Sequence, residues 1–194
     1  MLSTMWNESS PHVQWGVVII ASLAAAIVDL RTRRIPNWLT GSLFLVGVLR
    51  ACLGYGLAGL GDGLVGCLIM ALPFVLLFAF AGGGAADAKL MGALGVWLGT
   101  RNGLVAVAAV SVAGGLLGVI HAIMRRRFRG VIANLALLGW GFWGMLATRG
   151  RWADAAAAIP QPQAMLPMPY GLSIFVGICL ADIGVLHCRA HGLL

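Results

Sequence analysis

Residues 17–37 read VVIIASLAAAIVDLRTRRIPN, an apolar run that reaches Asp29 and then ends among arginines and a proline. The whole run, residues 13–30, approaches the roughly 20 apolar residues that a helix needs to cross a bilayer. The chain as a whole is also apolar. Of its 194 residues, 60% are hydrophobic and only 10% are charged. So few charged side chains cannot cover a soluble globule. The chain is therefore predicted to lie in a membrane.

Five more apolar segments follow the first, at residues 38–56, 64–81, 88–99, 104–124 and 170–187. Glycine-rich breaks at 56–63 and 82–84, and TRNG at 100–103, are expected to separate them. These segments predict an all-α polytopic membrane protein, a single domain over residues 1–194, with six transmembrane helices. Residues 131–148, inside a cytoplasmic loop at 125–169, are expected to form an interfacial or re-entrant segment; the alternative is a seventh span.

The basic residues predict the orientation of these spans. With the N-terminus outside, eight of them fall on the cytoplasmic side, as the positive-inside rule requires: Arg31, Arg33, Arg34, Lys89, Arg125, Arg126, Arg127 and Arg129. Only Arg50 and Arg101 lie outward among the first five spans. The formal charge of +7 is thus grouped in loops as a topology signal. We expect membrane lipid, and no nucleic acid, as a partner.

Two aspartates are the candidate catalytic residues. Asp29 ends the first span, and Asp87 follows the glycine run in FAGGGAADAKLMGAL, residues 80–94. A carboxylate near hydrocarbon costs several kcal/mol unless it is paired or wetted. In the six-span topology both aspartates reach the cytoplasmic face, where one carboxylate can activate a water while the other carries a proton. The spacing therefore indicates aspartic-protease chemistry in a wet notch left by the glycines.

The remaining polar residues give weaker signals. Asp62 in GLGDG is interpreted as a solvated loop residue. Asp182 lies well inside the last span, and its role is left open between an intramembrane function and a structural pairing. The four cysteines form no CxxC pair and no cluster with histidines, so neither a metal nor another cofactor is expected.

Three motifs in this order resemble those of the type IV prepilin peptidases, polytopic GxGD aspartic proteases. The first is Asp-x-Arg-x-x-x-Ile-Pro-Asn, beginning at Asp29, and the second is Gly-Gly-x-x-Asp-x-Lys-Leu around Asp87. The third, Pro-Tyr-Gly at residues 169–171, is similar to an element that precedes the final helix in the short, tight-adherence (Flp) branch of the family.

This resemblance implies an intramembrane endopeptidase that cleaves the leader peptide of Flp-like prepilins at the cytoplasmic face of the bacterial inner membrane. It implies that Asp29 and Asp87 are catalytic. It assigns substrate binding or site shaping to Gly82, Gly83, Gly84, Ala86, Lys89, Arg31, Pro36, Asn37, Pro169, Tyr170 and Gly171. The implied partners are prepilin and pseudopilin precursors and other pilus-assembly proteins.

Two departures from the family pattern qualify these expectations. Ala86 stands where GxGD has its second glycine, and the added methyl could restrict the backbone or narrow the approach of a substrate strand. Longer relatives carry a tetracysteine domain that this chain lacks between Asp29 and Asp87, which predicts peptidase activity without methyltransfer. The alternatives are a pilus-assembly scaffold whose activity is impaired and a transporter-like bundle with aspartate relay groups.

Overall fold

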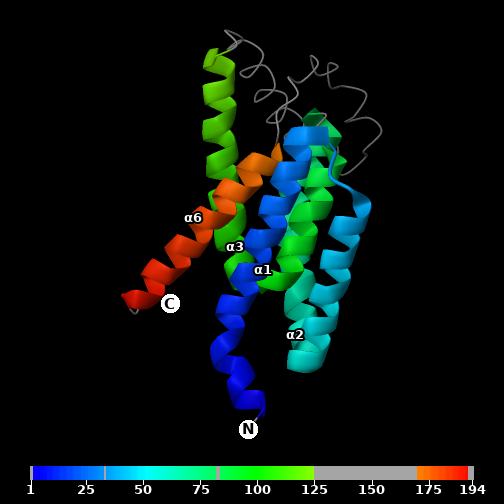
Figure 1. Cartoon of the computed structure of the whole chain (residues 1–194), viewed down its shortest axis with the longest axis vertical. Coiled ribbons are helices and arrows are strands. Elements are labelled where there is room, and N and C mark those ends of the chain that lie inside the picture. The colour runs from blue at the N-terminus through cyan, green and yellow to red at the C-terminus, as the bar shows by residue number, and fades with distance from the viewer. Residues whose placement is uncertain (1, 33, 82–83, 125–169, 192–194) are drawn as a thin grey trace, which may run out of the picture.

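The structure is a computed structural model that describes residues 2–32, 34–81, 84–124 and 170–191 (Figure 1). These ranges are helical apart from short connections, and the elements are α1 (Leu2–Thr32), α2 (Asn37–Ala81), α3 (Ala85–Met124) and α6 (Tyr170–Ala190). The all-α class is confirmed for this part of the chain. The expectations for Gly82, Gly83, Pro169 and the segment 125–169 lie outside the described residues.

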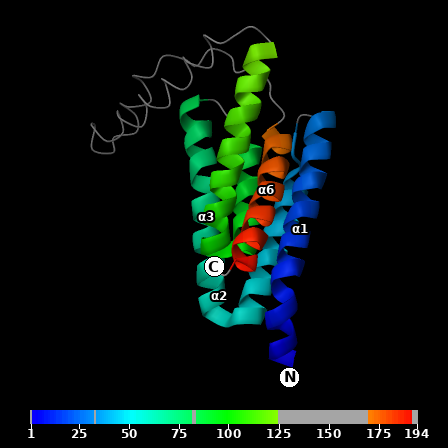
Figure 2. The same ribbon diagram turned by 90° about the vertical axis from the view of Figure 1, so that its left-hand side faces the viewer.

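Both α2 and α3 contain two helical arms joined at a glycine. The backbone leaves helical geometry at Gly56, with φ 63°, and at Gly99, with φ 69°. This left-handed region is strained for side-chain-bearing residues and easy for glycine. We call residues 37–56 and 57–81 the first and second arms of α2, and residues 85–99 and 100–124 the first and second arms of α3. The chain reverses at each joint (Figures 1 and 2).

The reversals are tighter than the sequence suggested. The predicted breaks at 56–63 and 100–103 were expected to be loops, yet residues 57–63 and 100–103 are helical in the structure. One glycine with positive φ makes each turn, so the following residues can start the next helix at once. Glycine-rich sequence alone marked the neighbourhood of each reversal but misplaced the loop.

The first arm of α3 forms the centre of the bundle. Its residues from Leu90 to Gly99 are all buried, and α3 as a whole packs against α2, α6 and α1. A helix that is apolar on every side belongs in such an interior position. Close backbone contact holds it against α2: a Cβ atom added to Gly66 would lie 2.5 Å from the carbonyl oxygen of Gly95. Small residues at this contact let the two helices approach closely, as in membrane proteins generally.

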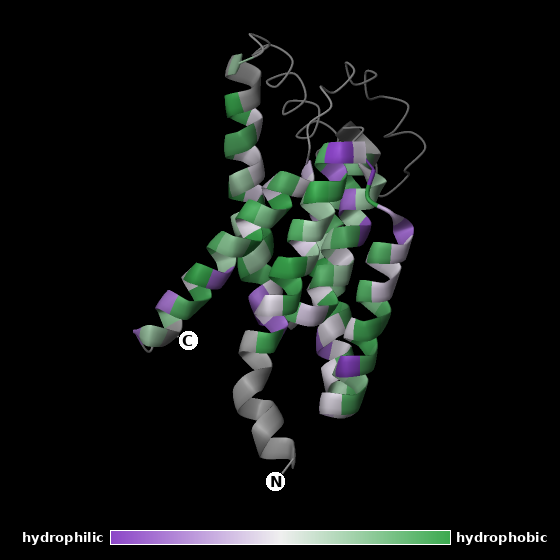
Figure 3. Ribbon diagram, viewed as in Figure 1, coloured by the Kyte–Doolittle hydropathy of each residue, from purple (hydrophilic) through white to green (hydrophobic). Residues whose placement is uncertain are grey.

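The outer surface of the bundle is apolar. In the described residues, four helical stretches are long and apolar enough to cross a membrane: Val13–Thr32, Asn37–Phe78, Ala85–Ile120 and Tyr170–Cys188. Leu53 and Leu57 are each 84% exposed, which water would penalise and lipid would not. Figure 3 shows that hydrophobic residues cover the flanks while hydrophilic ones gather mostly toward the helix ends. These features are those of an integral membrane protein.

Candidate active site

Asp29 lies near the end of α1 and is half-buried against the start of α6. Its Oδ2 accepts a hydrogen bond of 3.0 Å from the backbone N–H of Gly171. A Cβ atom on Gly171 would lie 3.0 Å from the Asp29 Cβ and 3.1 Å from the Ala26 Cα. The absence of a side chain at Gly171 therefore lets the two helices approach closely enough for the bond.

Asp87 lies in the first turn of α3, where it is buried with 8% of its surface exposed. Its backbone N–H donates to the carbonyl oxygen of Gly84 at 3.2 Å. A Cβ atom on Gly84 would lie 2.5 Å from the Asp87 Oδ2, so the carboxylate folds back over this glycine. The bare backbone at Gly84 therefore leaves room for the carboxylate at the start of α3.

The two carboxylates lie near each other at one end of the bundle. Asp87 lies close enough to Asp29 for their charges to interact, and the half-buried Tyr170 lies within the electrostatic reach of Asp87. The three residues come from α3, α1 and α6, whose relevant ends lie together (Figures 1 and 2). Neighbouring carboxylates in an enclosed site can divide the roles of acid and base between them. The structure thus brings together both aspartates and the Tyr170–Gly171 pair that the sequence singled out.

A polar link joins α2 to α3 at the same end. Lys89, two residues after Asp87, donates from Nζ to Oδ1 of Asn37 at 3.2 Å. Thr40 donates from Oγ1 to the Asn37 carbonyl oxygen at 3.1 Å, within the first turn of α2. The sequence identified Asn37 and Lys89 separately but did not predict their contact. The available signal was that both residues lie near the starts of helices that begin on the same side of the predicted membrane.

Two further predicted site residues, Arg31 and Pro36, lie near the connection between α1 and α2. Arg31 is exposed at the end of α1. Pro36 is half-buried in the connection to α2, and its carbonyl oxygen accepts from the Leu39 N–H at 3.1 Å. The preceding Ile35 is 7% exposed and belongs to the hydrophobic core, a packing role that the sequence analysis did not assign. The Ile-Pro-Asn motif therefore anchors the connection between α1 and α2.

Ala86 has ordinary helical backbone in the first turn of α3. Its methyl group is partly buried and packs against the hydrophobic core. Alanine adopts helical geometry more readily than glycine does, so the position requires no glycine for conformational reasons. The departure from GxGD at this position therefore gives no support to a distorted backbone beside Asp87.

Asp62 is exposed, as the sequence predicts, but it lies in a helix and not in a loop. It belongs to the second arm of α2, and its Oδ1 accepts from the Thr100 N–H at 3.1 Å. Thr100 in turn donates from Oγ1 to the Asp62 carbonyl oxygen at 3.5 Å. These bonds satisfy the first N–H group after Gly99 in the manner of a helix cap. Asp62 thus stabilises the reversal of α3 at the end of the arm that begins near Asp87.

No cluster of three or more His, Cys, Asp or Glu side chains able to hold a metal ion occurs within the described ranges.

Comparison with known proteins places the chain in a protein family. Residues 16–119, more than half of the chain, match the model of the type IV leader peptidase family. The prepilin leader peptidase/N-methyltransferase of Pectobacterium carotovorum subsp. carotovorum is 38% identical over 112 residues, which cover 50% of this chain and 38% of that protein. The protein of the same description from Aeromonas hydrophila is 30% identical over 153 residues, covering 70% of this chain and 52% of the relative.

The similarity to these relatives is partial in length. A prepilin leader peptidase/N-methyltransferase from Xanthomonas campestris pv. campestris is 27% identical over 157 residues and is covered to 55% of its length. The chain thus spans about half the length of the curated relatives, or less. No solved structure matches it significantly. The family match includes the positions of both Asp29 and Asp87.

Proposed function

Since the chain belongs to the type IV leader peptidase family, we propose that it cleaves the leader peptides of prepilins with Asp29 and Asp87 as its catalytic pair. The observation that carries this proposal is that the two carboxylates lie at one end of the bundle, within reach of each other's charge. They are separated by 58 positions in the chain (87 − 29) and come from different helices. Packing of α1, α3 and α6 supports this arrangement.

The proposed reaction is hydrolysis of a peptide bond by an activated water. One carboxylate accepts a proton from the water, whose oxygen attacks the scissile carbonyl carbon, and the partner carboxyl protonates the leaving amine. The Gly171 N–H holds one oxygen of Asp29 and so restricts the orientation of the carboxylate. The reaction needs no cofactor.

The proposed topology has six spans: α1, the two arms of α2, the two arms of α3, and α6. Arg31, Arg34 and Lys89 lie at the aspartate end, and this distribution supports placing that end in the cytoplasm of a bacterial inner membrane. Arg50 lies near the Gly56 reversal, over the rings of Tyr55 at 5.9 Å and Trp97 at 5.5 Å. Residues 131–148 are proposed to lie at the cytoplasmic surface.

The proposed substrates are Flp-like prepilins and pseudopilins, and the proposed activity is peptidase without methyltransfer. The Pro-Tyr-Gly element supports the first statement through its resemblance to the short branch of the family. The lack of a tetracysteine insertion between the two aspartates supports the second. The absence of methyltransfer is tested by incubating cleaved pilin with the protein and a radiolabelled methyl donor. Label on the new N-terminus would contradict the proposal.

The decisive experiment is co-expression with a candidate Flp-type prepilin, with cleavage followed as a shift in electrophoretic mobility. Asp29→Asn and Asp87→Asn should each abolish cleavage, because either change removes one member of the acid–base pair. Asp182→Asn is the matched control, since this carboxylate lies in α6 about 16 Å of helical rise beyond Gly171. Near-normal cleavage by either catalytic variant, at parental abundance in the membrane, would refute the proposed pair.

A further inference from the structure

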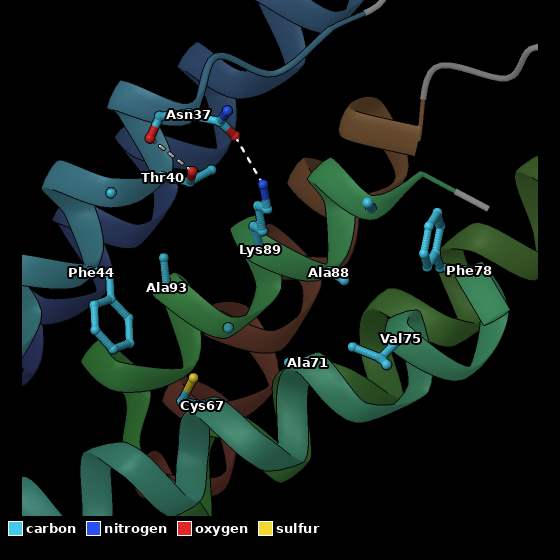
Figure 4. A pocket seen from close by; sticks show the side chains of 13 residues that line it. Asn37, Thr40, Phe44, Cys67, Ala71, Val75, Phe78, Ala88, Lys89 and Ala93 are labelled. Carbon is cyan, nitrogen blue, oxygen red and sulfur yellow. Dashed lines mark hydrogen bonds between the residues drawn. The ribbon is translucent and has the colours of Figure 1, made fainter. Parts of the chain in front are cut away.

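An apolar groove lies beside the first turn of α3, between the two arms of α2 (Figure 4). Its volume is about 610 Å³. Along α3 it extends from Ala85 to Ala93, about 12 Å at 1.5 Å of rise per residue. Neither Asp29 nor Asp87 lines it, although Ala88 and Lys89 directly follow Asp87. The groove is therefore a separate site that adjoins the candidate active site.

Polar groups are confined to one end of this groove. Phe44, Val75, Phe78 and several alanines and glycines form most of its wall. At the aspartate end lie Lys89 and Asn37, joined by their hydrogen bond (Figure 4). Both side chains are exposed, and the lysine brings a positive charge to the mouth of the groove. The groove therefore suits an occupant that is apolar along its length and anionic at one end.

The size of the groove excludes a whole transmembrane helix. Such a helix is about 30 Å long, whereas the groove runs for only about 12 Å along α3. The length of about 12 Å matches a single leaflet, roughly half of the 30 Å hydrocarbon core. The groove can thus accept one narrow chain that enters from one membrane face.

The lining also disfavours an extended peptide. Each residue of a peptide carries an N–H and a C=O that must be hydrogen-bonded when they leave water. A wall of phenylalanine, valine and alanine side chains offers no such partners over most of its length. A hydrocarbon chain needs none, and it gains from contact with these side chains. The groove therefore suits an acyl chain better than a polypeptide.

We propose that this groove binds one acyl chain of an anionic phospholipid, with the lipid phosphate at Lys89. The Asn37 amide supports the phosphate, because its Oδ1 accepts from Lys89 while its NH₂ group supplies further donors. Basic pockets between helices at a membrane face are known sites for anionic headgroups. The proposal requires that the chain is embedded in a bilayer, and it does not depend on the proposed peptidase activity.

Photocrosslinking of the full-length protein in nanodiscs tests this site. The probes are phosphatidylglycerol and phosphatidylcholine, each with a diazirine in one acyl chain, and the crosslinked residues are mapped by mass spectrometry. We expect phosphatidylglycerol to label the groove segments 67–78 and 85–93. Unlabelled phosphatidylglycerol should compete about fivefold better than phosphatidylcholine, which corresponds to about 1 kcal/mol for one basic residue beside an anionic lipid.

Variants separate the headgroup contact from the acyl-chain contact. Lys89→Gln should remove the preference for phosphatidylglycerol and Lys89→Arg should keep it, while Arg101→Gln, at the opposite end of the bundle, is the control. Gly41→Leu should lower groove labelling by both lipids, because nothing lies within 4 Å of a Cβ at Gly41 and the new side chain can enter the groove. Gly115→Leu is its control, with the same free space outside the groove.

Three outcomes would overturn the proposal: equal competition by the two lipids, undiminished labelling in Gly41→Leu, or displacement of the lipid by a prepilin peptide. The last would assign the groove to the substrate instead. The competition experiment uses the unaltered protein, so it decides the headgroup question even where a variant fails to insert.

Discussion

The backbone N–H of Gly171 donates a hydrogen bond of 3.0 Å to Oδ2 of Asp29, across 142 positions of the chain. The bond joins the start of α6 to the end of α1, and a hydrogen bond to a carboxylate is among the stronger kinds in proteins. It leaves Asp29 with one oxygen held by the backbone. The orientation of Asp29 therefore depends on how closely α6 approaches α1.

Gly171→Ala is predicted to reduce prepilin cleavage about tenfold or more. The new Cβ would lie 3.0 Å from the Asp29 Cβ and 3.1 Å from the Ala26 Cα, so the helices must separate and the bond must lengthen. Loss of a hydrogen bond to a charged group costs about 1.5–3 kcal/mol, which corresponds to a factor of ten or more. Cleavage rates measure the loss of activity, and thermal unfolding in detergent measures any loss of stability separately.

The matched control for this change is Gly184→Ala in the same helix, because nothing lies within 4 Å of a Cβ at that position. The control should cleave at the parental rate. Equal rates for Gly171→Ala and the parent would show that the bond to Asp29 does not orient a catalytic group.

Ala86→Gly is predicted to leave cleavage near the parental rate and to lower stability by about 1 kcal/mol. The methyl group packs against the core, and glycine in a helix is less favourable than alanine by about this amount. Ala86→Val should reduce cleavage, because added volume beside a packed core displaces the first turn of α3 and with it Asp87. A parental rate for the valine variant, measured with the same prepilin, would contradict this account.

Asp62→Ala is predicted to destabilise the protein by about 1 kcal/mol, since it removes the acceptor of the Thr100 N–H at the α3 reversal. Asp62→Asn should retain most of the stability, because its amide oxygen can accept the same bond. Thermal unfolding in detergent measures both effects. Identical melting temperatures for the alanine variant and the parent would show that the bond does not stabilise the reversal.

The proposed topology predicts which sites can be labelled from each side of the membrane. Single cysteines introduced at Arg34 and Ala85 in a cysteine-free background should react with an impermeant maleimide only from the cytoplasm. Cysteines at Asn102 and Gly61 should react only from outside. The reversals at Gly56 and Gly99 bring the two members of each pair to the same end of the bundle. Labelling of Asn102 and Ala85 from the same side would refute the six-span arrangement.

The sequence predicted the helical class from the length of the hydrophobic segments. It predicted the pairing of the two aspartates from the even number of membrane crossings between them. Counting spans places Asp29 and Asp87 at one end, whatever the details of packing. It could not predict that Gly84 and Gly171 admit the carboxylates, since those contacts depend on close approach between particular backbone atoms. The sequence named both glycines, but only the structure shows what each one contacts.

The reversals were less predictable for a related reason. Every glycine in 56–63 is compatible with a loop, and only tertiary packing selects Gly56 as the one with positive φ. The partner of Asp62 was not predicted because Thr100 lies 38 positions away, so local sequence carries no trace of the bond. The contact between Lys89 and Asn37, 52 positions apart, was missed in the same way.

The order in which the chain is synthesised determines when the Asp29–Gly171 hydrogen bond can form. Asp29 belongs to α1, and its backbone partner belongs to α6, which is synthesised 142 positions later. During translation the Asp29 carboxylate therefore lacks this partner until α6 has entered the bilayer. A nascent chain cannot orient Asp29 in this way before that point, so this contact between α1 and α6 forms only after α6 has been made.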